Sequence, residues 1–383
     1  MSDPIFRLFI LGAGFSKPAR LPLGLELLEE VRERIKAKYQ IHGWDGPLEE
    51  EIEEWRELYP NKELALEAVL AYSHRKHFLR LIGSDEYYSH GSRTIVEVRR
   101  LIQEILISKP LAIPPPLYIE FAKHLTAYDT VLTFNYDTLL EDALDQICKP
   151  YSLIPEWWLT NDQETATQGE YSEKYVDIIK LHGSIDWYDR DYHDAMRQFF
   201  QKQYGNNIPD TDPIFGLKQS IPFESLAKRR VENGYGENLL RRVFRIVNFR
   251  MYFPDLVNSY HEAVPFLLPP AYDKILGHDP IRDLWENMHR TLDGYSAIII
   301  IGYSMPDYDG YAYEAIGHLI ASYQKKGSAK THFNHRRVPV QIITLGSSKN
   351  EVLERIPFLQ RQRTRIWHKG FNSSSLNWLD WGD

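Results

Sequence analysis

The chain has 383 residues, of which 43% are hydrophobic and 26% are charged. This predicts a folded globular protein with one large domain or two ordinary ones. The formal net charge of −8 argues against a general polyanion binder but not against a local basic patch, and the single cysteine, Cys148, excludes an intramolecular disulfide framework and a four-cysteine zinc site.

The sequence predicts no targeting signal. The N-terminal residues include Asp3 and Arg7 but no long apolar stretch of the kind found in signal peptides. The longest strongly apolar run, residues 297–301, is far too short to cross a bilayer. Together with the lone cysteine, these features predict a soluble cytoplasmic protein with no membrane association.

A glycine turn follows the first expected strand. Residues 6–11 are mostly apolar and lead directly into Gly12-Ala13-Gly14, and residues 21–36 then show helical apolar spacing. This setting is typical of phosphate binding by backbone N–H groups. However, Lys17 stands where the full dinucleotide pattern has a third glycine. The turn alone is therefore compatible with two interpretations, a nucleotide-binding turn or an ordinary strand–helix turn.

Two insertions are expected in the chain. Residues 31–114 form the first, because apolar residues recur at helical spacing without a strand pattern until the proline run 114–116. The second covers residues 186–260, which are rich in aromatic and charged side chains and are expected to be partly helical. The rest, about residues 1–30 and 115–383, is expected to form one core domain.

Buried strands alternate with helices in this core. This alternation predicts an α/β fold with a Rossmann-like, mainly parallel sheet and helical insertions. After the first strand, the expected strands are residues 130–134, 176–181, 296–301 and 338–345, and the expected helices are residues 118–125, 138–147 and 283–292.

Several strands end in short polar or glycine-bearing clusters, which are residues 12–16, 135–137, 182–184 and 302–307. The carboxyl ends of parallel strands line one crevice, so these clusters are expected to meet. Each also has a structural explanation. Asn135 and Asp137 could cap the following helix, His182 could be a half-buried turn histidine, and Gly302-Tyr303-Ser304 could be a plain turn.

The order of these clusters resembles the sirtuin superfamily. Four motifs support this resemblance: Gly12-Ala13-Gly14-Phe15-Ser16, Thr133-Phe134-Asn135-Tyr136-Asp137, Leu181-His182-Gly183 and Gly302-Tyr303-Ser304. They look most like the sirtuin-like branch of bacterial antiphage defence. The resemblance implies a Rossmann-like domain that binds NAD and cleaves its nicotinamide–ribose bond.

Two features of classical sirtuin deacetylases are missing. Residues 17–24 lack the Gly-Ile-Pro-Asp-Phe-Arg loop, and one cysteine cannot supply a four-cysteine zinc module. The defence-type relatives lack both features and hydrolyse NAD outright. The expected activity is therefore an NAD⁺ hydrolase that depletes NAD in abortive infection, with NAD as a substrate and no metal.

Site roles follow from the converging strand ends together with the resemblance. Asn135 is expected to orient the water or the ribose, and His182 to act as general base. Asp137 is expected to hold the ribose hydroxyls or to position the site. Gly12, Ala13, Gly14 and Ser16 are expected to cradle the pyrophosphate, Phe15 is assigned to the same cofactor-binding set, Gly302 and Ser304 are expected at the phosphate or adenosine half, and Asp307 is expected nearby.

Other functions and partners stay open at this point. One alternative is a sirtuin-type deacylase or ADP-ribosyltransferase, and another is a non-catalytic module that senses NAD or ADP-ribose for a partner ATPase. A toxic NAD hydrolase needs gating, so a homo-oligomer and a partner in trans are expected. The resemblance points to a HerA-type ATPase or a short Argonaute-type protein, since the chain has no Walker A motif. The basic run 228–250 fits a contact to DNA or to a nucleotide signal, or else a solvated helix face or a subunit interface. An indirect link to DNA also stays open.

Overall fold

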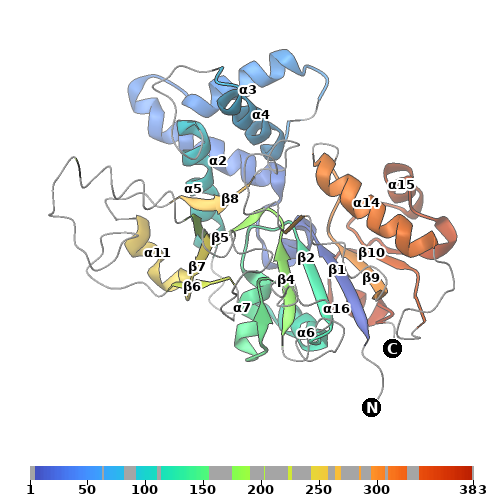
Figure 1. The fold of residues 1–383 in the computed structure, drawn as a ribbon. Helices are drawn as coiled ribbons and strands as arrows, with labels where there is room; N and C mark the ends of the chain where they lie inside the picture. The colour runs from blue at the N-terminus through green and yellow to red at the C-terminus, as the bar shows by residue number, and fades with distance from the viewer. Residues whose placement is uncertain are drawn as a thin grey trace.

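In the computed structural model (Figure 1), the described residues are 5–62, 64–81, 92–109, 114–154, 175–189, 202, 223–226, 243–257, 264–268, 284–285, 295–306, 309–325 and 336–381. Their main feature is a seven-stranded sheet in the order β11-β10-β9-β1-β2-β4-β3, in which every neighbouring pair is parallel. The predicted α/β fold with a parallel sheet is confirmed. Its strands are β1 (Phe6–Leu11), β2 (Asp129–Thr133), β3 (Tyr151–Ser152), β4 (Val176–Lys180), β9 (Tyr295–Ile301), β10 (Val340–Ile343) and β11 (Thr364–Trp367).

β1 lies at the centre of this sheet because it is apolar on both faces. Its residues after Phe6 are all buried, and so is every residue of its neighbour β9. From β1 the chain builds outward on one side through β2 and β4, and it returns to the other side with β9 and β10. This reversal of strand order is a topological switch point. In such sheets, ligands bind in the crevice outside the carboxyl ends of the strands.

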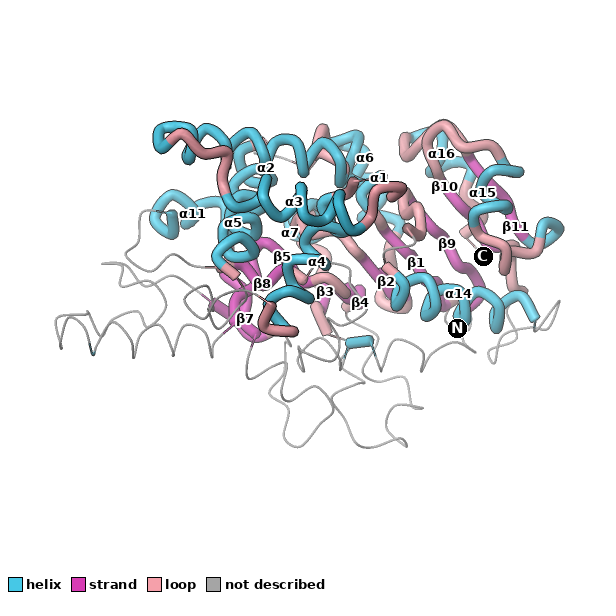
Figure 2. Tube along the Cα trace, turned by 90° about the horizontal axis from the view of Figure 1, so that it is seen from above, coloured by secondary structure: helices cyan, strands magenta, loops and turns pink. Residues whose placement is uncertain are grey.

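Two groups of helices accompany the sheet. One group accompanies the strands along the chain: α6 (Pro116–His124), α7 (Leu139–Gln146), α14 (Gly310–Lys325), α15 (Lys349–Arg355) and α16 (Ser373–Trp378). A second group lies above the sheet at the top of Figure 1 and is seen from above in Figure 2: α2 (Gly24–Tyr39), α3 (Pro47–Leu58), α4 (Leu66–Phe78) and α5 (Arg93–Ser108). We call this second group the helical layer. Its helices lie between residues 24 and 108, and the first insertion is predicted over residues 31–114.

A small antiparallel sheet begins directly after His182. Its four strands lie in the order β6-β7-β5-β8, and the sequence pattern did not predict it. The segments that pair here are far apart along the chain, and much of the intervening chain lies outside the described residues. Its strands are β5 (Gly183–Asp189), β6 (Phe223–Ser225), β7 (Val243–Ile246) and β8 (Pro265–Leu267), and helix α11 (Phe249–Val257) follows β7.

The described part of the basic run is paired within the protein. Arg245 Nε lies 3.1 Å from Glu224 Oε1, and its Nη1 donates to the hydroxyl of Tyr151 at 2.8 Å. Arg250 Nε lies 3.5 Å from Asp142 Oδ2. These two arginines therefore hold the small sheet and α11 against the core. The other basic residues of this run lie outside the described residues.

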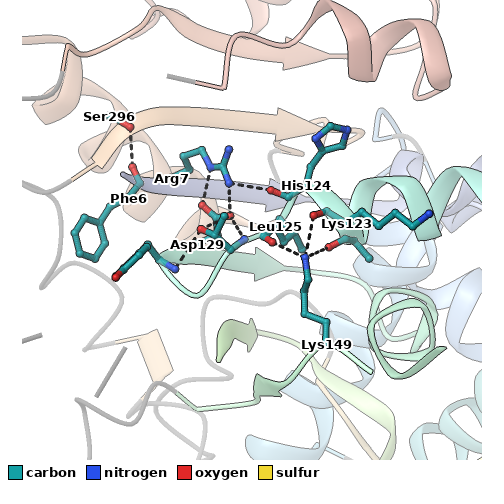
Figure 3. A network of polar contacts seen from close by, with 11 residues as sticks. Phe6, Arg7, Lys123, His124, Leu125, Asp129, Lys149 and Ser296 are labelled. Carbon is teal, nitrogen blue, oxygen red and sulfur yellow. Dashed lines mark hydrogen bonds and ion pairs between the residues drawn. The ribbon is translucent and has the colours of Figure 1, made fainter. Parts of the chain in front are cut away.

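The amino ends of β1 and β2 are joined by a buried ion pair (Figure 3). Arg7 donates from Nε to Asp129 Oδ1 at 2.7 Å and from Nη2 to Oδ2 at 2.6 Å, and Nη2 also donates to the carbonyl of His124. Nearby, Lys149 Nζ donates to the carbonyls of Lys123 and Leu125 at the end of α6. Each charged group thus has protein partners, as burial requires.

No helix among the described residues is long and apolar enough to cross a membrane.

Candidate active site

A cavity of about 350 Å³ lies where the carboxyl ends of the central strands meet the helical layer. All four predicted clusters contribute to its wall, so the convergence expected from strand order is realised. The wall also contains residues that the sequence did not single out. From the predicted clusters come Ala13, Gly14, Ser16, Asn135, Tyr136, Asp137, His182, Gly302, Tyr303, Ser304 and Pro306. From the segment before α2 and from the helical layer come Leu21, Leu27, Glu67 and Leu106, and from the segments before α14 and after β10 come Asp309, Thr344, Leu345, Ser347 and Arg355.

The turns after β1 and β9 pack backbone against backbone. Gly12 donates its N–H to the carbonyl of Ile301 at 3.0 Å, and Gly14 donates to that of Gly302 at 2.9 Å. Gly302 has φ +63°, and a Cβ there would lie 2.3 Å from the carbonyl carbon of Gly14. Only glycine fits such an approach. The Gly14 N–H is therefore hydrogen-bonded within the protein. Ala13 and Gly14 of this turn line the cavity.

Phe15 lies in the same turn but faces the core. Its side chain is 2% exposed and packs against the rings of Tyr118, Phe121 and Phe371. Its carbonyl accepts a hydrogen bond from the hydroxyl of Tyr118 at 2.8 Å. Neither Phe15 nor Gly12 is among the residues that line the cavity. The structure therefore places both behind the wall, where they hold the turn in position.

Asn135 presents an acceptor to the cavity. Its Nδ2 donates to the carbonyl of Gly12 and to Ser16 Oγ, both at 3.0 Å. A carbonyl can only accept, which fixes the orientation of the amide with its nitrogen toward Gly12. No residue in the described ranges donates to Oδ1. This oxygen is thus available to a hydroxyl or water in the cavity.

Ser16 and Asp137 continue this network. The hydroxyl of Ser16 donates to Asp137 Oδ2 at 2.8 Å. The other carboxylate oxygen of Asp137 accepts from the N–H of Leu139 at 3.0 Å, which satisfies the first turn of α7. Asp137 therefore satisfies a backbone N–H of α7 from the position before the N-cap residue, Thr138, and it also holds Ser16 beside Asn135.

A buried lysine supports the turn that carries these side chains. Lys180 Nζ donates to the carbonyl of Asp137 at 2.5 Å and to Glu141 Oε1 at 2.7 Å. Burial raises the pKa of Glu141 to about 7; Lys180 opposes this shift and Asp186 adds to it. Burial likewise raises the pKa of Asp142 to about 6, against the attraction of Arg250.

His182 pairs with a carboxylate that the sequence analysis missed. Its Nε2 lies 3.2 Å from Asp309 Oδ2, and the side chains are 6% and 2% exposed. The hydroxyl of Tyr303 donates to the same oxygen at 3.3 Å. The imidazole also meets the edge of Phe134, whose ring stacks on Tyr303 at 4.2 Å between centroids. The imidazole is thus fixed from two sides.

Asp309 was missed because its position resembles a helix cap. It directly precedes α14, where Asp is a common N-cap. Asp307 from the same loop was predicted instead, and it lies outside the described residues. The usable signal was a second aspartate after a strand end that already carried Gly302 and Ser304.

Within the described ranges, no group of three or more His, Cys, Asp or Glu side chains is placed to hold a metal ion.

Residues 129–217 match the family model of the SIR2-like domain. This segment contains β2, Asn135, Asp137, β4 and His182, and a SIR2-like domain implies NAD-related chemistry. No curated protein matches the chain.

Among solved structures, Sir2Tm bound to a propionylated peptide is 12% identical with a TM-score of 0.36. Sir2 with a p53 peptide and NAD⁺ is 12% identical with a TM-score of 0.34, and Sir2 bound to acetylated peptide is 11% identical with a TM-score of 0.31. Each match covers 96% of this chain and 88% of the other. Likenesses of this size carry no argument about the function of this chain.

Proposed function

We propose that the protein is an NAD⁺ hydrolase that releases nicotinamide and ADP-ribose. The observation that carries the proposal is that Asn135 and the His182–Asp309 pair line one cavity at the switch point of the sheet. An amide acceptor and an imidazole backed by a carboxylate are the groups needed to position and deprotonate a water. The SIR2-like domain match over these residues supports NAD as the molecule that is cut.

The chemistry is a substitution at C1′ of the nicotinamide ribose. The bond between C1′ and the nicotinamide nitrogen breaks, and its electron pair stays on nicotinamide, which leaves as a neutral molecule without needing a proton. The oxygen of water bonds to C1′ through an oxocarbenium-like transition state, as in glycoside hydrolysis. The water proton is the only one that the protein must accept.

Asn135 and His182 divide this work. Asn135 Oδ1 accepts a hydrogen bond from the water or from a ribose hydroxyl, and the two hydrogen bonds that Nδ2 donates hold the amide group in place. His182 takes the proton. Asp309 orients the imidazole and stabilises the positive charge that forms on it, while Tyr303 holds the carboxylate. Ser304, Gly302, Ala13 and Gly14 supply the wall against the phosphates and the adenosine half, and no role is derived for Asp307.

Nicotinamide release by purified protein tests the proposal. Asn135→Ala and His182→Ala are expected to lower the rate by about 10²–10⁴, with wild-type melting temperatures as the control for folding. Near-wild-type turnover in His182→Ala would overturn its role as base. Parallel reactions with an acylated peptide separate hydrolysis from deacylation: release of nicotinamide only when the peptide is present would favour a deacylase.

We further propose that the activity serves antiphage defence and is gated. The helical layer supplies Leu27, Glu67 and Leu106 to the cavity wall, so a shift of this layer would change access to the site. A HerA-type ATPase or a short Argonaute-type protein encoded beside this chain is the proposed partner, with a homo-oligomer as the alternative device. Comparing NAD consumption with and without the neighbouring gene product checks this: a partner that leaves the rate unchanged contradicts gating in trans.

A further inference from the structure

The cavity has two ends that the strand order separates. Asn135 and His182 follow β2 and β4, on one side of β1, whereas Thr344, Leu345 and Ser347 follow β10, two strands away on the other side. Four strand spacings of about 4.8 Å separate β4 from β10, or roughly 19 Å. A dinucleotide whose nicotinamide ribose lies at Asn135 would thus extend its adenosine half toward β10.

The far end has the composition of an adenosine site. Leu345 is an apolar side chain that is 67% exposed, and Thr344 and Ser347, which both carry a hydroxyl group, line the same cavity. Arg355, the last residue of α15, completes this part of the wall with a guanidinium group. We call these four residues the β10 end of the cavity.

Among the described residues, Arg355 has no counter-ion. No hydrogen bond or ion pair joins it to any residue in the described part of the chain, although it lies on the surface where such pairs are common. Glu351, four residues earlier on the same helix, instead accepts from the N–H of Ser348 at 2.6 Å in a capping box. The guanidinium is therefore available to an anion in the cavity.

Carboxylates line the cavity only elsewhere, among the residues that the structure describes. Asp137 follows β2, Asp309 lies between β9 and α14 and is paired with His182, and Glu67 belongs to the helical layer, while the β10 end contributes none. In Rossmann-type sites a carboxylate binds the 2′-hydroxyl of an unphosphorylated adenosine ribose, and an arginine accommodates a 2′-phosphate. The β10 end has the arginine.

We infer that the cavity accepts dinucleotides with a phosphate on the adenosine ribose, the NADP⁺ class, and that Arg355 is the residue that recognises this phosphate. The inference rests on the proposed function, because Asn135 and His182 define the nicotinamide end. Arg355 is a specificity residue and takes no part in bond cleavage.

Binding of adenosine 2′,5′-bisphosphate and of adenosine 5′-monophosphate, measured by calorimetry, tests the inference without turnover. Wild-type protein is expected to prefer the bisphosphate by about tenfold, as for a hydrogen bond to a charged group. Arg355→Gln should abolish the preference and Arg355→Lys should retain part of it. Arg361→Gln is the matched control, because Arg361 is exposed, pairs with Asn350 and does not line the cavity. Equal affinities in the wild type, or equal weakening of both ligands by Arg355→Gln, would overturn the inference.

Turnover separates this inference from the proposed function. If the wild type cleaves NAD⁺ but neither cleaves NADP⁺ nor prefers the bisphosphate, the inference fails and the proposed function stands. If neither dinucleotide is cleaved while the bisphosphate preference depends on Arg355, the proposed hydrolysis fails and the recognition of the 2′-phosphate stands.

Discussion

The two ends of the parallel sheet carry polar residues for different purposes. At the amino ends, Arg7 and Asp129 are buried and bonded to each other, and the arginine also reaches a carbonyl. At the carboxyl ends, Asn135 keeps one acceptor directed into a cavity and His182 lies at the same wall. Polar groups that bond only to other protein groups thus join strands, whereas polar groups that line a cavity are available to a ligand.

Removing the carboxylate at the amino ends should have the largest effect on stability. Asp129→Ala leaves Arg7 buried without its partner, which costs about 3–5 kcal/mol of unfolding free energy. Chemical denaturation measures this loss. Molecules that remain folded should retain the wild-type rate of NAD cleavage, and a variant as stable as the wild type would contradict the role of this pair.

Removing the charge of the carboxylate at the carboxyl ends should affect the rate. Asp309→Asn keeps the shape and burial of the side chain but loses the charge that stabilises the protonated His182. We expect a fall of about 10²-fold in turnover and a change in its pH profile, with the melting temperature nearly unchanged. If Asp309→Asn destabilised the fold as Asp129→Ala does while keeping its activity, the distinction between the two ends would fail.

The close approach of the two glycine turns can be tested with a matched pair. Gly302→Ala introduces a Cβ 2.3 Å from the carbonyl carbon of Gly14 at φ +63°. Gly346 has φ +82° but nothing within 4 Å of its hypothetical Cβ. Gly302→Ala and Gly346→Ala both carry backbone strain of about 1–3 kcal/mol. The additional loss of stability and of NAD binding in Gly302→Ala therefore measures the effect of the close contact with Gly14. Equal losses would show that the contact is unimportant.

The smallest predicted effect is a pH dependence of stability from Glu141. Its pKa rises from 4.5 to about 7 on folding, so between these values the folded protein keeps a proton that the unfolded chain has released. The free energy of unfolding should therefore fall as pH rises from about 4.5 to 7 and level off above 7. Glu141→Gln should make this slope shallower than in the wild type in denaturation curves taken across that range. An unchanged slope would contradict the raised pKa.

Sequence reasoning recovered the features that depend on local pattern. The apolar run of β9 and the short buried run of β2 identify strands without reference to anything distant. Parallel strand order then brings Asn135 and His182 to one edge, which is why the convergence could be anticipated. The helices α2 to α5 could be anticipated because their apolar residues keep helical spacing.

Features that depend on distant contacts were not recoverable. The small antiparallel sheet joins β5 to β7 and β8 from far along the chain, and its strands are short. Asp309 is indistinguishable in sequence from a helix cap until His182 is placed 3.2 Å away. Arg355 cannot be told from other surface arginines in the sequence, and only the structure shows that it lines the cavity.

The central claim is that the cavity at the carboxyl ends hydrolyses NAD⁺, and incubation in ¹⁸O-labelled water tests it most directly. Wild-type protein, with its partner where one is needed, should release nicotinamide and form ADP-ribose that carries one ¹⁸O atom at C1′. Asn135→Ala and His182→Ala should give neither product at a comparable rate. Binding of ADP-ribose without any nicotinamide release would contradict the claim and make the protein a binding module.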